Sequence, residues 1–223
     1  LLSSLPPADR LKLILVDKRT ALHWAALYSY TETVSGILSC LTCDQQLQLL
    51  FKQDIKGNTA LHKASRGTVR TLIDKLTPEQ QLQLLFTQDR MGNIALHCAA
   101  SRGDTETVSG ILNCLTLEQQ LQLLFTQDIG GNTPIHNAVQ EGHAETVKTL
   151  LENLTPEQQL KLLLTQNSDG STALHDAALL GRTETVKTIL DSLTPDQQLK
   201  LLITQNNKGT TANHEAARKG STY

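Results

Sequence analysis

Aromatic residues are scarce in this sequence. Phe, Tyr and Trp make up 3% of its 223 residues, too few and too scattered to form a surface on which nucleic-acid bases stack. The formal net charge of −2 provides no strong field to attract nucleic acid or an anionic membrane. No apolar run approaches the ~20 residues that a bilayer-spanning helix needs. We therefore expect neither nucleic acid nor a membrane as a partner.

Cysteine is also sparse, with four residues at positions 40, 43, 98 and 114. Cys40 and Cys43 form one C-x-x-C pair without a companion pair, so a structural zinc site would lack half of its ligands. We predict free thiols in a reducing, cytoplasmic or intracellular compartment, with metal or redox chemistry as the alternative. Residues 1–10 contain no basic segment followed by a long apolar stretch, so no signal peptide is visible.

One four-residue sequence motif, here called the repeated phrase, occurs in six copies. The copies begin at Thr20, Thr59, Ile94, Thr133, Thr172 and Thr211, and each ends three residues later in a histidine. Successive copies are 39 residues apart, except for a step of 35 between the second and the third. A fixed period of roughly 20–50 residues indicates a stacked array rather than a globule with one central core.

Residues 133–171 show the pattern of one unit. Thr133 with the proline that follows it suits the start of a helix, and Gly142 suits its end. A second helix is predicted near 144–154, where apolar residues recur at intervals of three and four. A third is predicted over 155–164, opening with a Thr-Pro pair and a capping-box glutamine. A turn led by Asp or Asn and closed by Gly precedes each later copy, which is typical of a type I β-turn.

This unit resembles the ankyrin repeat, whose ~33 residues form a turn and two antiparallel helices with a T-P-L-H-x-A signature. Residues 133–138 and 172–178 match that signature closely, and the likeness covers residues 20–219. The resemblance implies an all-α solenoid of stacked repeats with β-turn-like fingers. It also implies that the signature histidine bonds to the backbone and to the signature threonine. The units here are about six residues longer than usual, and this surplus predicts three helices per unit.

The period divides the chain into consecutive units. We expect the third helix of a preceding unit at 1–19, full units at 20–58, 59–93, 94–132, 133–171 and 172–210, and a partial unit at 211–223. The second unit is four residues short around residues 65–69, so its second helix should start late. Arrays need polar end caps, and neither end resembles one, so we expect a fragment of a longer protein.

Six of the seven histidines belong to the repeated phrase, which raises the question of a metal site. Equivalent residues on stacked helices are separated by roughly 8–10 Å, whereas each ligand of a zinc ion lies about 2.0–2.1 Å from it. We therefore expect no metal and no cofactor. No nucleophile is paired with a base outside the repeat pattern, so we expect no enzymatic activity.

The copies differ from one another mainly at positions four, seven and eight of the first helix, which share one face. With the turn residues, this face matches the concave face and fingertips that ankyrin proteins use for partners. The partner-binding candidates are Trp24, Leu27, Tyr28, Ile55, Lys56, Lys63, Arg90, Met91, Arg102, Ile129, Asn137, Gln140, Glu141, Asp169, Asp176, Leu179 and Leu180. Trp24, Leu27 and Tyr28 form the best hot-spot candidate. Two alternatives stay open: unconstrained drift at these positions, and a leading helix at 11–15 that covers Trp24.

The sequence thus predicts a non-catalytic protein-protein interaction module. One alternative is a structural spacer, or a stack that associates weakly end to end through exposed apolar faces. Another is the targeting arm of a larger bacterial effector or toxin that is secreted into a host cell, an expectation from analogy of style.

Overall fold

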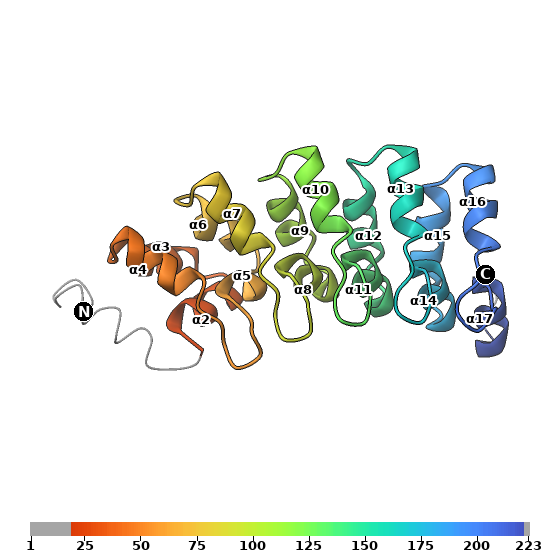
Figure 1. Cartoon of the computed structure of the whole chain (residues 1–223), viewed down its shortest axis with the longest axis horizontal. Helices are drawn as coiled ribbons and strands as arrows, with labels where there is room; N and C mark the ends of the chain where they lie inside the picture. Colours follow the sequence, from red (N-terminus) through yellow and green to blue (C-terminus); the bar gives the residue numbers. More distant parts are fainter. Residues whose placement is uncertain (1–18, 221–223) are drawn as a thin grey trace.

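The computed structural model describes residues 19–220, and every regular element within that range is a helix. The helices follow one another in a row of repeated units, and each unit ends in a turn, here called a finger (Figure 1). The expected helices at 1–19 lie outside the described residues, apart from residue 19. Among residues 19–220, no helix combines the length and the apolar character that crossing a membrane requires.

Three helices recur in each complete unit. The first helices are α2 (Ala21–Leu27), α5 (Ala60–Lys63), α8 (Ala95–Arg102), α11 (Pro134–Glu141), α14 (Ala173–Leu179) and α17 (Ala212–Lys219). The second helices are α3 (Thr31–Ser39), α6 (Thr68–Ile73), α9 (Thr105–Leu112), α12 (Ala144–Leu151) and α15 (Thr183–Asp191). The third helices are α4 (Cys43–Leu50), α7 (Pro78–Leu85), α10 (Leu117–Leu124), α13 (Pro156–Leu163) and α16 (Pro195–Leu202). The predicted all-α solenoid with three helices per unit is confirmed.

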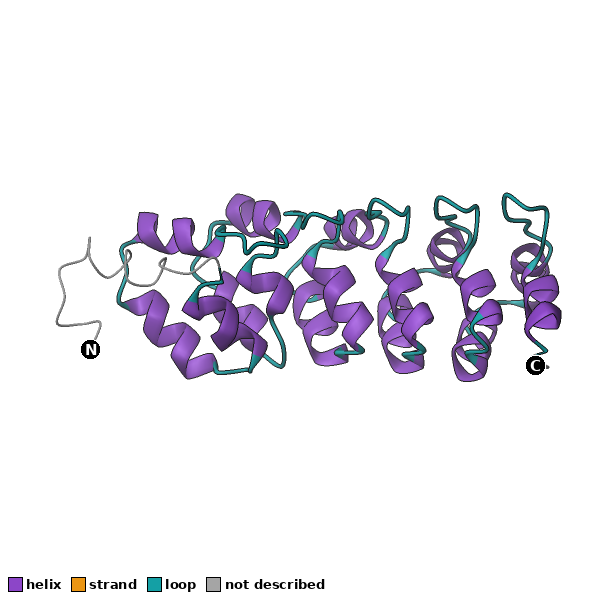
Figure 2. Ribbon diagram, turned by 90° about the horizontal axis from the view of Figure 1, so that it is seen from below, coloured by secondary structure: helices purple, strands orange, loops and turns teal. Residues whose placement is uncertain are grey.

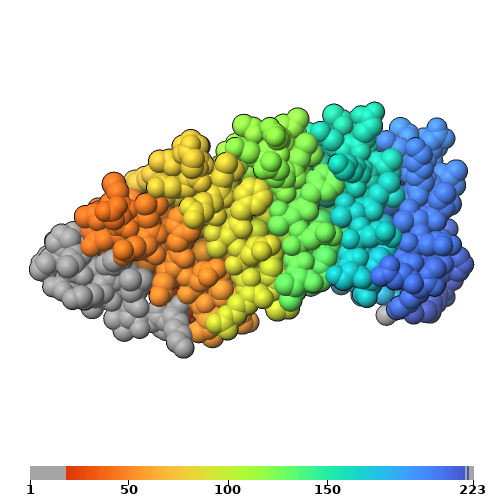
Figure 3. Space-filling model, viewed as in Figure 1, coloured from red at the N-terminus to blue at the C-terminus, as the bar shows by residue number. Residues whose placement is uncertain are grey.

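The apolar core runs along the array instead of gathering at a centre. Helix α11 packs against α8 on one side and α14 on the other, and each second helix packs against the second helices beside it. The space-filling view accordingly shows the units as successive bands that follow the sequence (Figure 3). Within a unit, Val147, Leu150 and Leu163 are fully or almost fully buried. Each unit is therefore stabilised mainly by its immediate neighbours.

Paired glutamines fix the third helix in every unit. Thr155 is the N-cap of α13, and its backbone N–H donates to Oε1 of Gln158 at 2.9 Å, which completes the predicted capping box. The next glutamine, Gln159, donates from Nε2 to the carbonyl oxygen of Leu151 at 2.9 Å. Because the last carbonyls of α12 have no partner within the helix, this bond satisfies one of them. The same glutamine bond recurs at Gln46, Gln81, Gln120 and Gln198.

Each finger is closed by its own first residue. Oδ1 of Asp54 accepts the backbone N–H groups of Lys56 and Asn58 at 2.8 and 2.9 Å, and Gly57 takes a positive φ of 83°. Neighbouring fingers are then joined by a backbone hydrogen bond, from the N–H of Arg90 to the carbonyl of Lys56 at 3.0 Å. Equivalent bonds of 2.9–3.0 Å join each of the next three pairs of fingers. The fingers therefore form a connected edge along the array (Figure 2).

The signature histidine ties each unit to the next finger. Nδ1 of His136 lies 2.8 Å from Oγ1 of Thr133, and its Nε2 donates to the carbonyl of Ser171 at 3.3 Å. Burial lowers the pKa of His136 to about 4, so the ring is neutral at pH 7. His23, His62, His97 and His175 place Nε2 2.8–3.0 Å from the carbonyl of the following finger. The bonding that the resemblance implied for this residue is confirmed.

The short second unit loses residues mainly from its first helix. Helix α5 has four residues, whereas the other first helices have seven or eight. Helix α6 then begins at Thr68, after Gly67 with a φ of 78°. The expectation of a late second helix therefore describes only part of the change, because the missing turn comes chiefly from α5.

Arg102 occupies the place of the missing turn. Its Nη1 donates to the carbonyl of His62 at 3.0 Å, and its Nη2 donates to the carbonyl of Ala64 at 2.6 Å. These carbonyls lie at the end of α5 and have no continuing helix to bond with. Oγ of Ser65 similarly donates to the carbonyl of Leu27 at 2.8 Å, at the end of α2. The long side chain of Arg102, from the following unit, thus replaces hydrogen bonds that the missing residues would provide.

Candidate protein-binding surface

The variable fourth positions of the first helices form a row, because α2, α5, α8, α11, α14 and α17 pack side by side. Their accessibility differs along that row. Trp24 is exposed, Lys63 and Asn137 are half-buried, and Asp176 is buried. The fourth positions of the predicted face therefore follow one another along the array, but a partner can reach only some of their side chains.

The fingers of the first, second and third units carry the most accessible apolar side chains of this surface. Ile55, Met91 and Ile129 are 56–66% exposed. Lys56 and Arg90, which are also exposed, stand next to the first two of them. We call these five residues the finger strip. Two backbone bonds of 3.0 Å hold it, from Arg90 to Lys56 and from Ile129 to Met91, so its side chains project from a fixed backbone.

Three aromatic side chains gather at the end of α2 and just after it. The rings of Trp24 and Tyr28 stack with centroids 6.0 Å apart and an interplanar angle of 8°. Tyr30 adds a tilted ring 5.9 Å from Tyr28, and all three are 41–58% exposed. We call these residues the aromatic cluster. Exposed rings held in contact with each other are pre-ordered apolar surface of the kind that anchors partners.

Arg19 connects the aromatic cluster with the first finger. Its Cζ lies 4.8 Å above the ring of Trp24, and its Nη2 lies 3.5 Å from Oδ2 of Asp54. Burial alone would raise the pKa of Asp54, but hydrogen bonds from Asn58 and Lys56 outweigh it and lower that pKa. Asp54 is therefore a carboxylate at pH 7, and it holds Arg19 in place beside the exposed indole.

Lys63 lies beside the same first finger. Burial lowers the pKa of its ammonium group, and the carboxylate of Asp54 acts in the opposite direction. Asp54 is close enough to Lys63 to favour its charged form. The carboxylate of the first finger therefore acts on both Lys63 and Arg19.

The fourth and fifth units present a different, acidic surface. Nε2 of Gln140 donates to Oδ2 of Asp176 at 2.9 Å, so these two candidates engage each other. Burial raises the pKa of Asp176, and the carboxylates of Asp169 and Glu215 add to that rise against the bond from Gln140. Glu141, Asp169 and Leu180 are exposed, whereas Leu179 is half-buried.

Two of the predicted residues have their side chains elsewhere. The guanidinium group of Arg102 bonds to the end of α5, as described above, so it supports the fold of the second unit. Leu27 is half-buried and lines a cleft over that unit together with Ser65 and Arg102. Leu27 is therefore not part of the stacked pair that Trp24 and Tyr28 form, and the expected three-residue hot spot separates into two places.

Sequence reasoning missed several residues that matter for this surface. Tyr30 precedes the second helix at a position where the other units carry unrelated residues. The repeat pattern therefore gave no indication that its ring contacts Tyr28. At the same position His143 bonds through Nε2 to the carbonyl of Ser101 at 3.1 Å. Arg182, also at this position, donates from Nη2 to the carbonyl of Gln140 at 2.8 Å. Both side chains reach back to the end of a preceding first helix, and only the structure reveals that shared role.

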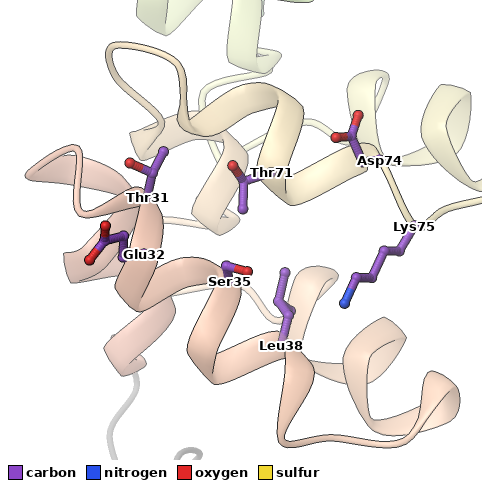
Figure 4. Close-up of a pocket in the computed structure, with 7 residues that line it drawn as sticks. All are labelled: Thr31, Glu32, Ser35, Leu38, Thr71, Asp74 and Lys75. Carbon is purple, nitrogen blue, oxygen red and sulfur yellow. The ribbon is translucent and has the colours of Figure 1, made fainter.

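One hollow lies between two neighbouring second helices, α3 and α6, and has a volume of about 370 Å³ (Figure 4). Its lining side chains are Thr31, Glu32, Ser35, Leu38, Thr71, Asp74 and Lys75. They include neither histidine nor cysteine. Across residues 19–220, no three or more His, Cys, Asp or Glu side chains come together as a potential metal site.

Comparison with known proteins agrees with this architecture. A family model described as ankyrin repeats (3 copies) matches residues 69–161 and 116–200, which together span more than half of the chain. A comparison with curated proteins finds no significant match. The turn, the paired helices and the signature histidine bonds are all present in the matched region. The chain therefore belongs to the ankyrin repeat family.

Proposed function

We propose that this chain is a non-catalytic module that binds a partner protein through the aromatic cluster and the finger strip. Ankyrin repeats are generally protein-protein interaction modules and are typically non-catalytic. The observation that carries the proposal is the exposure of large apolar side chains on a backbone that is already ordered. Ile55, Met91 and Ile129 stand on adjacent fingers joined by hydrogen bonds, and Trp24 and Tyr28 are stacked.

Such a surface favours binding for two physical reasons. Aromatic and large apolar side chains supply most of the energy of typical interfaces when a partner buries them. A fixed backbone also reduces the conformational entropy that is lost on association. The remaining candidates at the fourth and fifth units, including Glu141, Asp169 and Leu180, would extend this contact toward the C-terminal end.

Affinity capture with paired variants tests the proposal. The double variant Trp24→Ala, Tyr28→Ala should lose a specific protein partner that the parent chain retains. Leu117→Ala is the matched control, because Leu117 is an exposed apolar residue on the third helix α10, outside the proposed surface. Equal capture by the parent and the double variant, or a loss that appears only with Leu117→Ala, would contradict the proposal.

A second candidate function is association between copies of the chain. Leu199 and Ile203, on and just after α16, are 59% and 62% exposed. The corresponding residues of the preceding unit, Leu160 and Leu164, are partly buried against the core. An uncovered apolar face of this kind can associate with another array. The variant Leu199→Gln, Ile203→Gln should then lower the mass measured by light scattering at high concentration, whereas a parent chain that stays monomeric throughout would exclude this function.

A further inference from the structure

The cations of the finger strip are exposed, whereas the aspartates that open the same fingers, Asp54 and Asp89, are buried or half-buried. Lys56 and Arg90 are exposed, and neither forms an ion pair with a carboxylate within the described residues. The carboxylates of the same fingers are occupied by their own turns. Oδ1 of Asp54 accepts two backbone N–H groups, and Oδ1 of Asp89 accepts those of Met91 and Asn93 at 2.8 and 2.9 Å. The strip therefore presents positive charge to its surroundings.

Each of the first two fingers of this strip carries one apolar and one cationic side chain. Ile55 and Lys56 are neighbours on one finger, Arg90 and Met91 are neighbours on the next, and Ile129 follows on the third. The backbone bonds between these fingers fix the order and spacing of the side chains. Arg19, which is paired with Asp54, lies over the exposed ring of Trp24, and Lys63 is a half-buried cation near the same carboxylate.

Farther along the array, the charged residues of the candidate surface are acidic. The exposed residues there include Glu141 and Asp169, and the pKa of Asp176 is raised first by burial and further by Asp169 and Glu215. Acidic groups thus lie close enough to one another to repel additional negative charge. An acidic partner would be attracted to Lys56 and Arg90 on the first two fingers and repelled by Glu141 and Asp169 of the fourth unit.

From this polarity we propose that the occupant of the finger strip and the aromatic cluster is an acidic protein segment that bears large apolar side chains. Its carboxylates face Lys56 and Arg90, and its apolar side chains contact Ile55, Met91, Ile129 and the aromatic cluster. Glu141 and Asp169 of the fourth unit repel these carboxylates, so the acidic part of the segment lies over the first fingers. This inference rests on the proposed function and specifies the chemistry of the partner.

An anionic membrane is a less suitable occupant of the same side chains. The fingers lie along one edge of the array (Figure 2). A flat anionic surface that touched the fingers of Ile55 and Met91 would also approach the exposed Asp169 farther along that edge. A protein segment can cover the basic fingers alone.

Selection from a random library of 16-residue peptides displayed on phage tests this inference. Peptides recovered on the immobilised chain should be enriched in Asp and Glu together with Leu, Phe and Trp, and depleted in Lys and Arg. The variant Lys56→Glu, Arg90→Glu should bind such a peptide about tenfold or more weakly at low salt. The control Lys75→Glu, Lys148→Glu changes two exposed cations on or beside the second helices and should alter its affinity by less than about twofold.

Several results would overturn the inference. Recovered peptides that depend on Trp24 but lack acidic enrichment would leave the proposed function standing and refute the acidic partner. A library that yields no enriched peptide would count against both. Sedimentation with phosphatidylserine vesicles that is lost in the Lys56→Glu, Arg90→Glu variant would assign the strip to a membrane instead.

Discussion

Acidification should destabilise this protein through its buried signature histidines, and His136 allows the effect to be calculated. The ring is neutral in the folded chain, because Nδ1 faces the hydroxyl and N–H of Thr133 while Nε2 donates to Ser171. A proton added at Nδ1 would oppose the N–H of Thr133. Burial lowers the pKa of His136 from 6.5 to about 4, so the unfolded chain binds this proton more readily than the folded chain.

The sign and the size of the effect follow from this difference. Because the unfolded chain binds more protons below pH 6.5, the free energy of unfolding falls as the pH falls. The contribution of His136 is fully present above pH 6.5 and is lost by about pH 4, and its full size is about 3 kcal/mol. Between pH 7.5 and 5.5, before most carboxylates titrate, the expected loss is about 1 kcal/mol from this residue. His23, His62, His97 and His175 act in the same direction, because burial lowers their pKa values too.

Urea unfolding at pH 7.5 and 5.5 measures this loss in the parent chain and in His136→Gln. The variant should be less stable at pH 7.5 by about 1–3 kcal/mol, since it loses a buried bonded ring. Its stability should depend less on pH, by about 1 kcal/mol over this interval. An NMR titration should place the pKa of His136 near 4. A ring that titrates near 6.5, together with an unchanged pH dependence in the variant, would refute the reasoning.

Three further substitutions test how the units are joined. Arg102→Ala should cost about 1–3 kcal/mol in urea unfolding, because it leaves carbonyls at the end of α5 without donors; the exposed control Arg70→Ala should cost less than about 0.5 kcal/mol. Gly131→Ala should lower the melting temperature, because its φ is 75° and its new Cβ would lie 2.6 Å from the backbone nitrogen of Ser168; Gly36→Ala, which meets no atom within 4 Å in α3, should not lower it. Gln159→Ala should cost about 1 kcal/mol by removing a helix cap, and an unchanged unfolding midpoint would contradict that role.

Periodic features of the fold could be predicted from the sequence. The 39-residue spacing predicted stacked units. The repeated Thr-Pro and Gly positions helped to predict three helices in each unit, because these residues favour the start and the end of a helix. The role of the signature histidine followed from the family resemblance, and the bonds of His136 agree with it. The shortened unit was also visible in the sequence. Its consequence was not, since the bond from Arg102 to the carbonyl of His62 joins residues 40 positions apart.

The candidate surface could be predicted less well. Variation between units identifies side chains that are free of the core, but it does not distinguish exposed residues from those paired across units. Asp176 and Gln140 vary in type and yet bond to each other, and Leu27 lies in a different place from Trp24. Tyr30 and Arg19 contribute to the surface through contacts that no repeat pattern contains. These facts depend on the three-dimensional path of side chains, which periodicity does not specify.

Site-specific photo-crosslinking tests most directly whether a partner lies on the proposed surface. p-Benzoylphenylalanine in place of Met91, on the finger strip, should form a covalent adduct with a protein partner upon irradiation. The same residue in place of Leu117, on the third helix α10, should not. Adducts formed from position 117 and absent from position 91 would show that the partner binds elsewhere, and would contradict the account.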